Sequence, residues 1–146
     1  MAIKTAFIRP VAGFQALLSS LPPKSVAVRP QLACLGKFVD YTCSQTYKAF
    51  REGGKAAGKF EVVWLCRLSC TKRVSGAIGF CRPRGEIVAL LSPGKIDAAK
   101  LGLPAKFSCS KAVFDALALE YGFGPAALGK YALEDLLVEK CAVEFI

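Results

Sequence analysis

Short apolar runs alternate with amphipathic segments along the whole chain, and this alternation limits the folds that the sequence can adopt. Residues Thr5–Arg9 and Glu86–Leu91 have the pattern of strands, and the second contains the run IVALL and is closed by Ser92-Pro93-Gly94. Strands that alternate with helical segments are typical of α/β domains. At 146 residues, the chain has the length of one domain with a sizeable core. We therefore expect a single α/β domain over residues 1–146, with a small mixed sheet packed with several helices.

The helical segments are marked by apolar residues three and four positions apart. The clearest is Asp40–Glu52, for which we expect Asp40 as the N-cap and Gly53-Gly54 as the stop. Further helices are expected at 13–21, 74–80, 110–121 and 131–141. Ser25–Leu35 is an extended candidate, whereas the pattern of Phe60–Leu68 fits a buried strand and a buried helix equally well.

The last of these helices has an apolar stripe and a polar side. The apolar positions are Leu133, Leu136, Leu137 and Cys141, and the polar side is expected to carry Glu134, Asp135 and Glu139. Two interpretations of the stripe stay open. It packs on the domain's own core, or part of it meets a partner.

Charge is unevenly distributed along the chain. The net charge is +9, but residues 1–111 hold 18 Lys and Arg against 5 Asp and Glu, whereas residues 112–146 hold 2 against 6. A basic body attracts polyanions such as RNA, although ordinary surface charges for solubility give a similar composition. No apolar run is long enough to cross a membrane, so no membrane partner is expected. Lys4, Arg9 and Pro10 argue against a signal peptide, so we expect a cytoplasmic protein.

The residue types point to a heat-adapted source. The chain has no Asn and only three Gln, which is typical of proteins that avoid thermolabile amides. It has seven cysteines, and intracellular proteins of hyperthermophiles can be rich in disulfides. Because the number is odd, at least one thiol is free or pairs between chains. The sequence does not determine the pairing.

The sequence offers little catalytic chemistry. It has no histidine, which removes the usual general base and the commonest metal ligand, and its cysteines form no CxxC pair. Residues 122–127, GFGPAA, resemble a dinucleotide fingerprint but follow a helix, so a helix-ending turn is expected there. We therefore expect no catalytic residues, no metal and no cofactor. The alternative is a small-molecule-binding or cysteine-based redox domain.

One stretch, WLCRLSCTKRVSGAI at 64–78, places two adjacent cations between apolar segments. Lys72 and Arg73 form either a solvated turn or a site that binds an anion. At a helix start, such cations act together with free backbone N–H groups, and Val74 and Ile78 add an apolar surface one turn apart. Four further cations are candidates to add to the positive electrostatic field around this site: Arg67, Lys59, Arg82 and Arg84.

This stretch resembles the signature of the PRPK-binding protein (TPRKB) family. In that family an apolar helix leads through a small-residue turn into Arg-Gln-Ile and then, after two residues, Ala-Ile. Lys72-Arg73-Val74 stands at the Arg-Gln-Ile position, and Ala77-Ile78 matches. YKAFREGG and the C-terminal LVEKCAV are similar to the family's basic helix and closing helix. Departures are the three replacements in Arg-Gln-Ile, Val63 where Glu is common and Arg82 where Gly is frequent.

The resemblance implies a specific role. Members of that family are the small non-catalytic subunit of the KEOPS complex, which makes threonylcarbamoyladenosine in tRNA. They bind the kinase-like ATPase subunit and the 3′ CCA end of tRNA. By resemblance, tRNA would contact the 72–78 segment, and an archaeal source would fit the missing amides. The closing helix would contact the kinase through these residues: Leu133, Glu134, Leu137, Val138 and Cys141.

Overall fold

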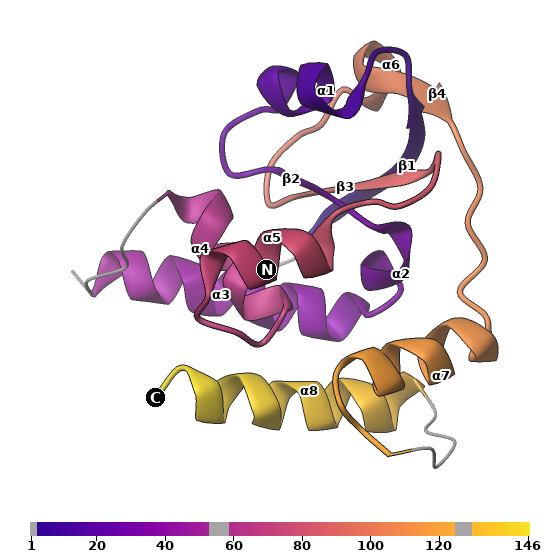
Figure 1. Ribbon diagram of the computed structural model, residues 1–146. Helices are drawn as coiled ribbons and strands as arrows, with labels where there is room; N and C mark the ends of the chain where they lie inside the picture. Colours follow the sequence, from indigo (N-terminus) through magenta and orange to yellow (C-terminus); the bar gives the residue numbers. More distant parts are fainter. Residues whose placement is uncertain (1–2, 53–58, 125–129) are drawn as a thin grey trace.

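The computed structural model describes residues 3–52, 59–124 and 130–146, and its four strands form one sheet (Figure 1). The strands are β1 (Lys4–Pro10), β2 (Val26–Val28), β3 (Val88–Ser92) and β4 (Gly102–Pro104), in the order β2-β3-β1-β4. Every pair of neighbouring strands among the described residues is antiparallel. The expected single α/β domain is therefore confirmed, but the expected mixed sheet is wrong. β1 and β2 run in the same direction, as do β3 and β4, but no two parallel strands are neighbours in the sheet.

Eight helices surround the sheet in the described part of the chain. They are α1 (Phe14–Ser20), α2 (Pro30–Ala33), α3 (Gly36–Arg51), α4 (Phe60–Leu68), α5 (Val74–Cys81), α6 (Ala98–Leu101), α7 (Lys111–Glu120) and α8 (Lys130–Glu144). The segment Phe60–Leu68, which fitted both states, is a helix. The extended prediction for Ser25–Leu35 holds only for β2, because Pro30 begins α2 at a position where its fixed φ suits a helix start.

The start of α3 differs from the sequence prediction. The helix begins at Gly36 after Leu35, so Asp40 lies inside the helix and is not its N-cap. The Asp40 carboxylate instead accepts a hydrogen bond from the backbone N–H of Ile3 at 3.3 Å. This bond holds the residue just before β1 against α3. The predicted stop, Gly53-Gly54, lies outside the described residues.

Helices cover both faces of the sheet and form a further layer (Figure 1). Alternate residues of β3 point to opposite faces, as strand geometry requires. Val88 and Leu90 belong to a small core with α1 and α6, whereas Ala89 and Leu91 belong to the main core. The main core also contains residues of α2 to α5, and α7 and α8 pack against these helices on the side away from the sheet.

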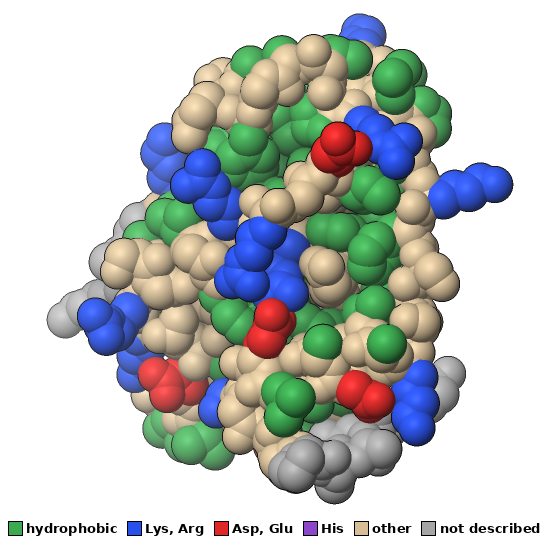
Figure 2. Space-filling view, turned by 45° about the vertical axis from the view of Figure 1, so that its right-hand side comes forward, with side chains coloured by type: hydrophobic (Ala, Val, Ile, Leu, Met, Phe, Trp, Pro, Cys, Tyr) green, Lys and Arg blue, Asp and Glu red, His purple; other side chains and the backbone are tan. Residues whose placement is uncertain are grey.

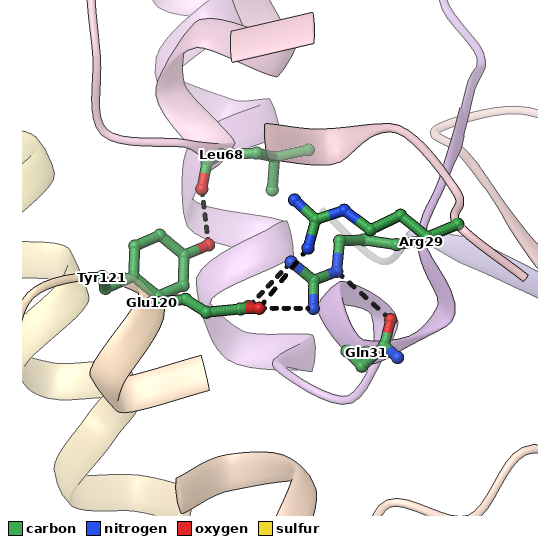
Figure 3. Close-up of polar contacts among 6 residues, drawn as sticks. Arg29, Gln31, Leu68, Glu120 and Tyr121 are labelled. Carbon is green, nitrogen blue, oxygen red and sulfur yellow. Dashed lines mark hydrogen bonds and ion pairs between the residues drawn. The ribbon is translucent and has the colours of Figure 1, made fainter. Parts of the chain in front are cut away.

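Long-range polar contacts and a disulfide hold α7 in this outer layer. Arg29, at the start of α2, is almost fully buried and pairs with Glu120 at 2.7 Å, and the Tyr121 hydroxyl donates to the Leu68 carbonyl oxygen at 2.6 Å (Figure 3). A disulfide joins Cys34 to Cys109, just before α7. Gly122 has a φ of +91°, which ends the helix in the turn that the sequence predicted.

Candidate functional site

The turn between α4 and α5 presents Lys72 and Arg73 to solvent. The backbone N–H of Thr71 bonds to the Cys66 carbonyl oxygen at 3.0 Å and closes α4, and the Arg73 N–H donates to the Thr71 hydroxyl at 3.2 Å. These local bonds stop one helix and turn the chain into the next. Both cationic side chains are exposed. Arg73, the N-cap residue of α5, makes no side-chain capping bond, and the residues of the first turn are exposed beside the two cations.

Helix α5 has one buried face and one exposed face. Ala77 and Cys81 are buried in the domain, whereas Val74 and Ile78 each remain 46% exposed. Arg82, which follows the helix directly, is four residues beyond Ile78 and is also exposed. Spacing by four places these exposed residues along one side of the helix. The result is an apolar stripe with cations at both ends.

A groove of ≈ 190 Å³ lies beside this stripe, between α1 and α5. Phe14, Leu18, Ile78 and Arg82 contribute to its walls, and the Arg82 guanidinium lies 5.9 Å from the centre of the Phe14 ring. The sequence analysis missed Phe14 and Leu18. Their spacing by four residues places them on one side of α1, but only the groove that α1 shares with α5 shows that this side belongs to the site.

The other predicted cations do not join this group. Arg67 faces the end of α8, where its guanidinium lies 4.5 Å from the centre of the Phe145 ring. Arg84 pairs with Glu120 at 3.6 Å. Lys59 precedes α4, so roughly 14 Å of helix separates it from the turn that holds Lys72. The structure therefore brings together Lys72, Arg73, Val74, Ile78 and Arg82, which we call the α5 surface.

The uneven charge along the chain is also uneven in space. Figure 2 shows Lys and Arg side chains among hydrophobic patches on one face of the molecule. Most of the Asp and Glu side chains visible on this face lie in its lower half, at the level of α7 and α8 in Figure 1. Lys and Arg side chains are also visible in that lower half, so the acidic side chains are mixed with cations there, whereas cations predominate in the upper half.

No protein-family model matches the chain, and no curated protein matches its sequence. A function for this chain therefore has to be inferred from its own side chains.

The residues predicted to contact a kinase lie mostly inside the domain. Leu133, Leu137 and Cys141 are fully buried, and Val138 is half-buried against the main core. The apolar stripe of α8 thus packs on its own domain. What α8 exposes lies on another side and includes Val143, which is 70% exposed.

Glu134 corrects the prediction for the polar side of α8. It is fully buried, and its carboxylate accepts the backbone N–H of Phe38 at 3.0 Å. Phe38 lies in the first turn of α3, where no residue of α3 itself supplies a capping side chain among the described residues. Glu134 therefore acts as the cap of α3 from another helix, since a carboxylate is favourable near a helix N-terminus. The neighbouring Asp135 pairs with Lys37 at 2.8 Å on the surface.

The cysteines that remain thiols are poorly suited to nucleophilic chemistry, with one exception. Burial raises the pKa of Cys66, and it raises the pKa of Cys43 and Cys81 to about 12. A thiol with a raised pKa is mostly protonated at neutral pH and reacts slowly. The exception is Cys141, whose pKa is lowered by a hydrogen bond from Cys70.

Two further absences apply to the described ranges. No group of three or more Cys, Asp or Glu side chains in residues 3–52, 59–124 and 130–146 is arranged to hold a metal ion. Within the same ranges, no helix combines the length and the apolar character needed to cross a membrane.

Proposed function

We propose that this protein is a non-catalytic subunit of the KEOPS complex, which binds the 3′ CCA end of tRNA and the kinase-like ATPase subunit. The observation that carries the proposal is the α5 surface. Lys72 and Arg73 stand at the first two signature positions of the PRPK-binding protein family that the chain resembles. Both side chains are exposed at the start of α5, and an exposed apolar stripe lies next to them. Phosphates are bound by cations and helix N-termini, and unpaired bases by apolar and aromatic faces.

The groove beside α5 adds to this support. Single-stranded RNA ends are recognised by stacking on aromatic rings and on arginine planes, with hydrogen bonds to base edges. Phe14, Ile78 and Arg82 supply an aromatic ring, an aliphatic wall and a guanidinium within one groove. A terminal base inserted there would lie beside the C-terminal half of α5, and the phosphates of the preceding nucleotides would extend along the helix toward Lys72.

The alternative, a cysteine-based redox or small-molecule-binding domain, has less support. The raised pKa of Cys66 and Cys81 disfavours either thiol as a nucleophile. The largest cavity among those described has a volume of ≈ 460 Å³, and cations and Glu86 lie in its walls. Apolar side chains such as Phe14 and Val88 line the same cavity, so its lining is mixed and the raised pKa values carry the argument against this alternative.

The test is a double charge reversal, Lys72→Glu with Arg73→Glu. Its matched control is Lys95→Glu with Lys106→Glu, which changes the net charge equally at two other exposed positions. We expect the first pair to weaken tRNA binding at least tenfold and to reduce the slope of log affinity against log salt by about 1.4, since each phosphate contact to single-stranded RNA contributes about 0.7. The control pair should change affinity much less.

Two further measurements distinguish binding at this site from general electrostatic attraction and from unfolding. tRNA that lacks the terminal CCA should bind the wild-type protein as weakly as intact tRNA binds the double variant. Thermal melts should show that both double variants remain folded. Equal affinities of the two double variants for intact tRNA would contradict the assignment of the site.

A further inference from the structure

The contact between α8 and the turn after α4 contains two thiols whose positions the sequence did not relate. Cys70 follows α4, and Cys141 lies in the last part of α8. The Sγ of Cys141 lies 3.6 Å from the carbonyl oxygen of Arg67, and the backbone N–H of Cys70 donates to the same oxygen at 3.1 Å. Interaction between the two thiols raises the pKa of Cys70 and lowers the pKa of Cys141. Both belong to the main core, and Cys70 is 7% exposed while Cys141 is fully buried.

The backbone at Cys70 adds a second observation. Its φ is +55°, in the left-handed region that favours glycine. The position is the turn that ends α4, where helices commonly end in glycine. A cysteine here occupies an unfavourable conformation and places a thiol against the only thiol of α8.

We propose that Cys70 and Cys141 form a second disulfide, which fastens the end of α8 to the turn between α4 and α5. The first disulfide, Cys34–Cys109, already fastens the start of α7 to the body of the domain. The two bonds together would hold the α7–α8 layer at both of its ends. This inference does not depend on the proposed function, although Cys70 lies two residues before Lys72 and the bond would also fix the basic turn.

The oxidant belongs to the class of small-molecule or protein disulfides, the class that forms Cys34–Cys109 by exchange. The Cys70 thiolate attacks the oxidant and releases one thiolate, which leaves Cys70 in a mixed disulfide. The Cys141 thiolate then attacks the Cys70 sulfur and releases the second. Two electrons pass from the cysteine pair to the oxidant, and the two cysteine protons end on the two released thiols.

The surroundings of Cys141 favour the second step. In the free pair, a hydrogen bond from Cys70 and the charge of Arg67 lower the pKa of Cys141. In the mixed disulfide Cys70 has no proton to donate, so only the charge of Arg67 still favours the Cys141 thiolate, which is the attacking form. Burial of both sulfurs makes the first step slow in the folded chain. Refolding from the reduced state, in which Cys70 is accessible, should therefore form the bond faster than treatment of the folded protein.

The experiment uses the full chain in two ways. Folded protein is incubated with oxidised glutathione, and reduced unfolded protein is refolded in a glutathione redox buffer. Tryptic digestion without reductant should yield the peptide 68–72 linked to the peptide 141–146. In the chain that keeps Cys34–Cys109, the number of thiols should fall from five to three. The oxidised protein should melt several degrees above the form in which only Cys34–Cys109 is bonded.

Two variants make the result specific. Cys141→Ser should abolish both the linked peptide and the rise in melting temperature. Cys66→Ala, which removes another buried thiol from the same helix–turn segment, should retain both. The proposal is overturned if Cys34–Cys109 forms in the redox buffer while 68–72 and 141–146 remain unlinked in both procedures. It is equally overturned if Cys70 pairs with another cysteine of the folded chain.

Discussion

At the scale of single residues, the buried carboxylate of Glu134 is the most informative side chain. It comes from α8, yet it satisfies a backbone donor in the first turn of α3, 96 positions away in the sequence. Its neighbour Asp135 makes a short ion pair with Lys37, but both of those side chains are well exposed. Glu134 and Asp135 are adjacent in the sequence, but they therefore differ greatly in their contribution to the stability of the fold.

This difference gives a direct prediction. Glu134→Ala should lower the free energy of unfolding by about 1–3 kcal/mol, because it leaves the Phe38 N–H buried without an acceptor. Asp135→Ala should cost less than about 1 kcal/mol, since an exposed ion pair contributes little. Urea unfolding of both variants beside the wild type measures the two values. A loss of unfolding free energy for Glu134→Ala as small as that for Asp135→Ala would show that the cap of α3 is not important to stability.

A second residue-scale prediction concerns alkaline pH. Burial raises the pKa of the Cys81 thiol from 9.0 to about 12. The unfolded chain therefore loses this proton at lower pH than the folded chain does. The stabilisation is fully present below about pH 9 and decreases as pH rises toward about 12, by up to about 1.4 kcal/mol per pH unit.

Cys81→Ala removes this titration. Its unfolding free energy, measured in urea, should lie below that of the wild type at about pH 8, because a buried sulfur is lost. The difference should shrink at about pH 10.5, because only the wild type suffers the penalty of ionisation. The loss of packing is the same at both pH values, so a constant difference would contradict the raised pKa.

At the scale of elements, α8 has one side buried in the domain and another side exposed to solvent. Val138 packs against the main core, whereas Val143 is 70% exposed. Within the proposed function, the kinase subunit would meet this exposed side. The apolar stripe that the sequence offered as an interface is already covered by the domain.

Three matched substitutions test this division of α8. Val143→Arg should weaken binding of the kinase subunit about tenfold or more and leave the melting temperature almost unchanged, because apolar residues at an interface carry much of its energy. Val138→Arg should destabilise the domain by about 2 kcal/mol or more, since it places a charge against the core. Val11→Arg is the control for an equally exposed valine, 71% exposed and outside α8, and should change neither property. Calorimetric titration beside thermal melts distinguishes the three; normal kinase binding by Val143→Arg would place the interface elsewhere.

At the scale of the whole molecule, the outer layer depends on contacts that are distant in sequence. The Cys34–Cys109 disulfide spans 75 positions and joins α2 to the segment before α7. The ion pair between the buried Arg29 and the more exposed Glu120 lies at the other end of α7, as does the bond from Tyr121 to Leu68 (Figure 3). The orientation of α7 is thus determined at both of its ends.

The disulfide should account for a large part of the global stability. In the chain-entropy model, a closed loop of this length contributes about 4 kcal/mol, which is a substantial fraction of the stability of an ordinary domain. The double variant Cys34→Ala with Cys109→Ala should therefore unfold at a clearly lower urea concentration than the wild type. Guanidinium unfolding serves as a second measure, and unchanged midpoints in both would show that the bond does not constrain the unfolded chain.

Much of the local structure is determined by the sequence alone, because it depends on neighbours within a few residues. Apolar periodicity located α3, α7 and α8 to within a few positions, and the run IVALL located β3. The exposed pair Lys72-Arg73 was also found from its immediate context, since two adjacent cations rarely enter a core. The division between a basic body and an acidic end is a property of composition and needs no fold.

The tertiary structure alone decided the features that join distant segments. No local pattern distinguishes Glu134 from Asp135, and only the approach of α3 makes one of them a buried cap. Periodicity could not choose the state of Phe60–Leu68, because its residues suit a buried strand as well as a helix. The pairing of cysteines and the choice of which cations share the α5 surface depend on distances across the fold. Sequence spacing does not encode those distances, because they arise only when helices from separate parts of the chain pack together.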